Sequence, residues 1–150
     1  MQLTTLGKSP LKVSRLCLGT MMLGDQTPLE DARAIVADAH EKGCNFIDTA
    51  DVYTRGKSEE MVGQILKGQR QQWVLASKVG NPMSDQPNHQ GYSRSWMLRA
   101  CEGSLRRLDT DHLDIYYLHR DYNGMNLEEP LRAIEALSLI HISEPTRLRR

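Results

Sequence analysis

Four side chains that can exchange protons lie at or just after the ends of short apolar segments. The segment "NFID" ends in Asp48 with Tyr53 five residues later, "WVLASK" ends in Lys78, and "LDIYYLH" ends in His119. Each residue taken singly has an ordinary structural interpretation, such as a loop-capping carboxylate or an ion-paired lysine. An acid, a phenol, an amine and an imidazole at neighbouring strand ends together indicate a catalytic site.

The chemistry that needs this set is proton donation to a carbonyl oxygen while a hydride arrives at the carbonyl carbon. A free tyrosine has a pKa of about 10, too high for an efficient acid at neutral pH, so Tyr53 needs a nearby cation that favours its phenolate. Lys78 is the candidate cation, and Asp48 would keep it charged while cancelling part of its field. His119 would orient the carbonyl or join the proton relay.

Each apolar run is followed by a segment with helical periodicity. The expected helices span Thr27 to Lys42, the motif "KSEEMVGQILKG", about Ser93 to Leu108, and a fourth segment that starts between Asn126 and Pro130. Thr27, Pro28 and Glu30 fit a capping box with proline at the first helical position. The predicted inward faces are Met61, Val62, Ile65 and Leu66 in the second helix, and Leu131, Ile134 and Leu137 in the fourth.

The strict alternation of apolar strands and helices predicts a parallel sheet covered by helices. Both a doubly wound open sheet and a (β/α) barrel satisfy it. The turn after the first strand reads "LGTMMLGDQTP" and lacks the G-x-G-x-x-G of a Rossmann fold, which favours the barrel. The candidate residues fit this fold, because barrel active sites form at the carboxyl ends of the strands.

Two further segments predict features beside the sheet, a β-hairpin and a loop that borders a binding pocket. "LTTL" and "LKV" flank a turn composition at Gly7–Pro10 and predict a β-hairpin before the first strand. The long loop from Val79 to Tyr92 follows a strand, so we expect it to border a binding pocket.

Composition argues against several classes of partner. Lys and Arg total 19, as do Asp and Glu, so the formal charge is zero and favours neither nucleic acid nor an anionic membrane. No segment reads as a signal peptide or a membrane span, and we expect a cytoplasmic protein. Cys17, Cys44 and Cys101 lie far apart inside apolar patterns, which predicts buried thiols with neither a disulfide nor a metal site.

Four motifs, "FIDTADVY", "GKSEEMVG", "LASK" and "DIYYLHR", resemble those of the aldo-keto reductases in order, spacing and residue type. The resemblance extends over about residues 3–136. It implies an α/β fold of the (β/α)8 TIM barrel family, with NADPH as the usual hydride donor and small-molecule aldehydes or ketones as substrates.

The resemblance also implies roles for individual residues. Tyr53 matches the general acid, Lys78 and Asp48 match its supporting pair, and His119 matches a substrate-orienting histidine. The residues expected near the nicotinamide of the cofactor are Gly19, Thr20, Met21 and Asp48.

The chain supplies the hairpin and about the first four of eight βα units, so we interpret residues 1–136 as the N-terminal half of such a barrel. From Leu137 the sequence reads "LSLIHISEPTRLRR". This stretch is similar to the conceptual translation of an adaptor used in sequencing libraries, and we interpret residues 137–150 as a non-native tail. A diverged C-terminus and a basic segment for an acidic partner are the alternatives.

Three functional hypotheses follow. The parent protein is an NADPH-dependent carbonyl reductase, or it is a cofactor-sensing binding or regulatory subunit that keeps the fold without useful turnover. The 150-residue chain itself is expected to be inactive as a fragment.

Overall fold

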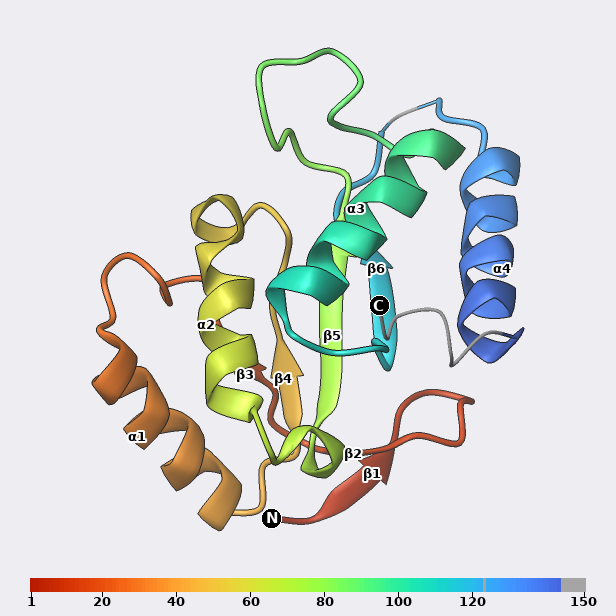
Figure 1. The fold of residues 1–150 in the computed structure, drawn as a ribbon. Helices are drawn as coiled ribbons and strands as arrows, with labels where there is room; N and C mark the ends of the chain where they lie inside the picture. Colours follow the sequence, from red (N-terminus) through yellow and green to blue (C-terminus); the bar gives the residue numbers. More distant parts are fainter. Residues whose placement is uncertain (123, 144–150) are drawn as a thin grey trace.

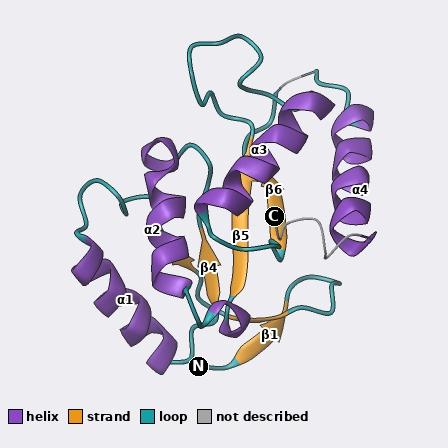
Figure 2. Ribbon diagram, viewed as in Figure 1, coloured by secondary structure: helices purple, strands orange, loops and turns teal. Residues whose placement is uncertain are grey.

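The computed structural model describes residues 1–122 and 124–143, and its centre is a four-stranded parallel sheet. The strands, in spatial order, are β3 (Leu18–Gly19), β4 (Phe46–Asp48), β5 (Val74–Val79) and β6 (Ile115–Leu118). The helices are α1 (Leu29–Glu41), α2 (Lys57–Leu66), α3 (Arg94–Arg107) and α4 (Glu128–Ser143), with short 3-10 turns η1 (Tyr53–Gly56) and η2 (Arg70–Gln72). The predicted alternation of strand and helix is confirmed (Figures 1 and 2).

The main core lies between the sheet and its covering helices. Ile47 of β4 and Leu75 of β5 are register partners, and both are buried in one cluster with Val36 of α1 and Val62 of α2. Each of these side chains is at most 2% exposed. Burial of apolar side chains on this scale is the main force that holds the helices on the sheet.

The opposite face of the sheet carries a second, smaller core. Phe46 and Ala76 pack there with Val13 of the β-hairpin, which is formed by β1 (Leu3–Thr5) and β2 (Lys12–Ser14) in antiparallel register. The predicted hairpin is therefore present, and it lies beside the start of the strands (Figure 1). Because side chains alternate along a strand, Asp48 and Lys78 share the face of Phe46 and Ala76.

Helix ends agree with expectation except at the first helix. Helix α3 begins beside the predicted start, and Ser93 caps it, because its side chain accepts a hydrogen bond from the backbone N–H of Trp96. The capping box at Thr27 is wrong. Pro28 is the N-cap residue of α1 and no side chain caps that end, since Thr27 lies in an isolated bridge with Leu23.

Two of the three residues predicted to face inward on helix α4 pack against the core, Ile134 partly buried and Leu137 buried, and only the prediction for Leu131 is wrong. Leu131 is 59% exposed, whereas Ala133 is completely buried against α3. The prediction for Leu137 is confirmed, because it packs with Cys101 and Leu105. The boundary at residue 136 stays a prediction: α4 continues to Ser143, and the rest of the expected tail, 144–150, lies outside the described residues.

Two of the three cysteine predictions are confirmed. Cys44 and Cys101 are buried free thiols, but Cys17 is exposed. Cys17 directly precedes β3, which is an edge strand of the sheet formed by the described residues. Among the described residues, no helix is both long and apolar enough to cross a membrane.

Candidate active site

Lys78 is the centre of the predicted constellation. Its Nζ donates hydrogen bonds to Asp48 Oδ2 at 2.6 Å, to the backbone oxygen of Thr49 at 2.8 Å and to the Tyr53 hydroxyl at 3.0 Å. The Lys78 side chain is only 13% exposed. Three acceptors occupy the three donors of the ammonium group, so the position of its charge is fixed.

Tyr53 reaches Lys78 through an unusual backbone turn. The two residues after it, Thr54 and Arg55, both adopt left-handed conformations, with φ of 47° and 54°. Such conformations cost on the order of 1–3 kcal/mol each in non-glycine residues. The Thr54 hydroxyl stabilises the turn by donating to the backbone oxygen of Leu23 at 2.8 Å.

His119 follows β6 and lies beside Tyr53. The two rings are perpendicular, with centroids 5.7 Å apart. Burial, then the charge of Lys78, lowers the pKa of His119 below its usual value of 6.5, so the imidazole is neutral at pH 7. Nδ1 of His119 is buried and has no hydrogen-bond partner among residues 1–122 and 124–143.

The residues expected near the cofactor surround the carboxyl end of β4. Gly19 is the register partner of Asp48, and both the backbone N–H and the hydroxyl of Thr20 donate to the backbone oxygen of Asp48 at 3.0 Å. Thr20 is completely buried, whereas Met21 is 59% exposed. An exposed apolar side chain next to a fixed polar turn suits contact with a flat, partly polar ring such as nicotinamide.

The comparison with protein families identifies the fold. The model of the Aldo/keto reductase family matches residues 15–139. The chain belongs to the aldo/keto reductase family.

Two individual relatives are similar to the chain over most of its length. The chain is 39% identical over 136 residues to an uncharacterized oxidoreductase of Bacillus subtilis, YqkF, covering 88% of this chain and 43% of the relative. It is 37% identical over 140 residues to a probable voltage-gated potassium channel subunit beta of Arabidopsis thaliana, covering 89% of this chain and 42% of the relative.

A solved structure of a family member has the same fold as this chain. The holo form of the aldo-keto reductase AKR11C1 from Bacillus halodurans has a TM-score of 0.85 at 39% identity, covering 95% of this chain and 48% of that one. The chain therefore spans about half the length of the family members it matches, and its sheet is part of a TIM barrel.

Between the sheet and its covering helices, this aldo/keto reductase chain has a buried charge network that was not predicted from the sequence. Glu59 has no exposed surface, accepts a hydrogen bond from Ser77 at 2.5 Å and forms an ion pair with Arg107 at 2.7 Å. Glu59 lies near the start of the motif "KSEEMVGQILKG", and nothing in that pattern predicts its burial. Arg107 reaches it over Gly56, where an added Cβ would lie 2.7 Å from the arginine side chain.

Asp51 is the second residue that the sequence did not single out. It has no exposed surface, and neither carboxylate oxygen has a hydrogen-bond partner among the described residues. Burial, then the charge of Glu59, raises the pKa of Asp51 to about 7. Its position inside the "DTADVY" motif carries no signal that separates it from an ordinary loop aspartate.

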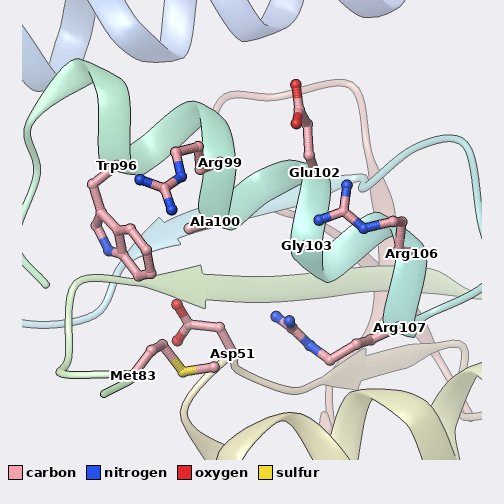
Figure 3. Close-up of a pocket in the computed structure, with 9 residues that line it drawn as sticks. All are labelled: Asp51, Met83, Trp96, Arg99, Ala100, Glu102, Gly103, Arg106 and Arg107. Atoms are coloured by element: carbon pink, nitrogen blue, oxygen red, sulfur yellow. The ribbon is translucent and has the colours of Figure 1, made fainter. Parts of the chain in front are cut away.

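A cavity of about 290 Å³ lies between Asp51 and helix α3 (Figure 3). Trp96 and Ala100 line one part of it and Arg107 another. Met83 lines it too, so the long loop after β5 does border a pocket. None of the four predicted catalytic residues lines this cavity, which makes it separate from the constellation around Lys78.

Proposed function

We propose that the chain is the N-terminal half of an NADPH-dependent reductase that converts aldehydes or ketones to alcohols, with Tyr53 as the general acid. The observation that carries the proposal is the hydrogen bond of 3.0 Å between Lys78 Nζ and the Tyr53 hydroxyl. Family membership supports an oxidoreductase with a nicotinamide cofactor.

The proposed mechanism assigns one task to each residue. Tyr53 gives its proton to the carbonyl oxygen, and the Lys78 ammonium stabilises the phenolate that forms. Asp48 keeps Lys78 charged and in place at 2.6 Å. His119, neutral at pH 7, orients the carbonyl by donating a hydrogen bond from its ring.

NADPH, when bound, supplies the hydride that the carbonyl carbon receives. The residues proposed to hold its nicotinamide end are Gly19, Thr20, Met21 and Asp48. Thr20 fits this task because its two hydrogen bonds to Asp48 fix the turn that presents Met21.

The test is Tyr53→Phe in the full-length protein that carries this chain. The variant should bind NADPH with unchanged affinity and lose about 10²- to 10⁴-fold in carbonyl reduction, the usual contribution of a general acid. Tyr117→Phe is the matched control, because Tyr117 is the register partner of Lys78 on β6 but makes none of the hydrogen bonds to its ammonium group. Turnover by Tyr53→Phe equal to that of the control would refute the proposed acid.

Carbonyl reduction by the wild-type protein decides between this proposal and the alternative of a cofactor-sensing regulatory subunit. Two of the matched relatives carry the name of a probable voltage-gated potassium channel subunit beta. A wild-type protein that binds NADPH but reduces none of a broad panel of aldehydes and ketones would favour that alternative. We favour the enzyme because the complete proton-donating set is assembled around Lys78.

A further inference from the structure

Two chain segments leave the carboxyl ends of β5 and β6 beside the candidate active site, and a tyrosine joins them. The first is the loop 80–92, and the second is the segment 119–122; both lie at the same end of the sheet (Figure 1). The Tyr92 hydroxyl donates to the backbone oxygen of Arg120 at 2.6 Å and accepts from the backbone N–H of Arg120 at 2.9 Å. One hydroxyl thus satisfies both backbone groups of the residue that follows His119.

A second tyrosine completes the link in the opposite direction. The Tyr122 hydroxyl donates to the backbone oxygen of Gly80 at 2.6 Å, and the N–H of Gly91 donates to the same oxygen at 2.8 Å. The rings of Tyr92 and Tyr122 meet edge to face with centroids 5.3 Å apart. We call Tyr92, Tyr122, Gly80 and Arg120 the tyrosine brace.

Gly80 makes the close packing of this brace possible. Its φ is 133°, and an added Cβ would lie 2.5 Å from the Tyr92 ring, so a larger residue has no room. Tyr92 itself is only 4% exposed. The ring and hydroxyl of Tyr92 therefore have one available position.

His119 depends on its backbone for its own position. Its N–H donates to the backbone oxygen of Val79 at 2.9 Å, while its Nδ1 has no hydrogen-bond partner in the described part of the chain. The ring is consequently not anchored through that nitrogen. The chain is held on one side of His119 by Val79 and on the other side by Tyr92 through Arg120.

We propose that Tyr92 is a positioning residue that fixes the His119 imidazole against Tyr53 by clamping the backbone of Arg120. This inference rests on the proposed carbonyl reduction and adds a residue to it. Loss of the clamp lets the His119 backbone move, which misaligns the group that orients the carbonyl, and leaves the Lys78 constellation intact.

The test is Tyr92→Phe in the full-length protein, because it removes the hydroxyl and keeps the ring. We expect kcat/KM for a carbonyl substrate to fall about five- to tenfold, as for the loss of a buried hydrogen bond, with unchanged affinity for NADPH. Tyr116→Phe is the matched control: the Tyr116 hydroxyl is buried on β6 without a partner among the described residues, so its removal breaks no bond. A Tyr92→Phe enzyme as active as Tyr116→Phe would overturn the proposal.

Two further variants separate positioning from general loop stability. Tyr122→Phe loosens the loop 80–92 at Gly80 but leaves both bonds to Arg120, so its loss should stay below about twofold. In a His119→Ala background, Tyr92→Phe should cause almost no further loss, because its effect passes through His119. A loss from Tyr122→Phe equal to that from Tyr92→Phe, or an undiminished effect in the His119→Ala background, would overturn the proposal.

A measurement without turnover distinguishes failure of this inference from failure of the proposed function. If the wild-type protein reduces no carbonyl, the function fails, and the ring signals of His119 in NMR spectra decide the inference. They should shift in Tyr92→Phe and not in Tyr116→Phe; unchanged signals in both would overturn it. Should Tyr92→Phe not fold, amide exchange of the wild type decides, since a rapidly exchanging Arg120 amide contradicts the clamp.

Discussion

Asp48 and Asp51 lie three residues apart on one segment, yet their carboxylates have opposite surroundings. Asp48 pairs with Lys78 at 2.6 Å, and its side chain is 23% exposed. Asp51 has no exposed surface and no hydrogen-bond partner among the described residues. The first carboxylate is held in an ion pair, whereas the raised pKa of the second, about 7, lets it keep a proton near neutral pH.

The difference arises from what each face of the sheet provides. Asp48 shares its face with Lys78, whose ammonium is free to pair with it. Asp51 faces the cavity next to α3, where the guanidinium of Arg107 already pairs with Glu59. Burial and the charge of Glu59 raise the pKa of Asp51, and the charges of Arg107 and Lys78 offset this only in part, whereas Asp48 has Lys78 as a direct partner.

The largest expected effect comes from removing the cation that pairs with Asp48, which leaves its carboxylate without that partner, as the carboxylate of Asp51 is. Lys78→Met removes the cation, so Asp48 loses its partner and Tyr53 loses the donor that stabilises its phenolate. We expect kcat/KM for carbonyl reduction to fall by about 10³-fold in the full-length protein, measured by steady-state kinetics at saturating NADPH.

Asp51→Asn is the control for this prediction. It changes a carboxylate on the same segment that touches neither Lys78 nor Tyr53, so turnover should stay within about threefold of wild type. A Lys78→Met enzyme that keeps a tenth of the wild-type rate, or an Asp51→Asn enzyme equally impaired, would contradict the assignment of the two carboxylates.

The second largest expected effect concerns the buried ion pair between Arg107 and Glu59. Arg107→Met leaves Glu59 completely buried, with only Ser77 as a side-chain partner among the residues that the structure describes. Removing one member of a buried ion pair typically costs about 3–5 kcal/mol, so we expect a loss of about 3 kcal/mol in the free energy of unfolding, measured by urea denaturation.

Lys42→Met is the control for the network, because Lys42 forms an ion pair of similar length, 2.6 Å, with Asp38 at the surface. The side chains of that pair are 69% and 61% exposed, and such pairs contribute at most about 0.5–1 kcal/mol. Equal losses in the two variants would mean that Glu59 reaches water or another partner when Arg107 is gone.

Much of the fold was predictable because its signals are local. Apolar runs and helical periodicity each act within a few residues, and the structure confirms the strands and helices that they predict. The exposed Leu131 was not predictable in this way. Its exposure depends on how α4 is rotated against α3, and Ala133 occupies that contact instead.

The candidate site was predictable for a different reason. Asp48, Lys78 and His119 lie at or beside the carboxyl ends of strands, and parallel strands bring these ends to one edge whatever the details of packing. Glu59 and Asp51 gave no such signal, because their burial depends on an arginine 48 positions from Glu59 in the sequence and on a cavity between elements. Tyr92 was similarly hidden, since its partner Arg120 is 28 positions away.

The smallest expected effect concerns the proton on Asp51. In the folded protein its pKa is about 7, against 3.8 for the unperturbed group, so between these values the folded state keeps a proton that the unfolded state has lost. The free energy of unfolding therefore falls as pH rises from about 4 to 7, and this loss is absent below that window and complete above it. Asn carries no such proton, so Asp51→Asn should gain stability relative to wild type across the window. The full shift sets an upper limit of about 4 kcal/mol, and we expect about 2 kcal/mol because water entering the cavity would solvate an ionised Asp51.

Urea denaturation at pH 4 and pH 8 measures this difference, and Asp48→Asn is its control. That variant removes a carboxylate from the same segment, but one whose charge Lys78 stabilises, so it should lose stability at pH 8 and gain none. Opposite signs for two aspartates three residues apart would show that the pairing cation, and not the position in the motif, sets the state of each carboxylate. A wild-type protein and an Asp51→Asn variant with parallel stability curves between pH 4 and 8 would instead mean that Asp51 has found a partner, with Arg107, which lines the same cavity, as a candidate.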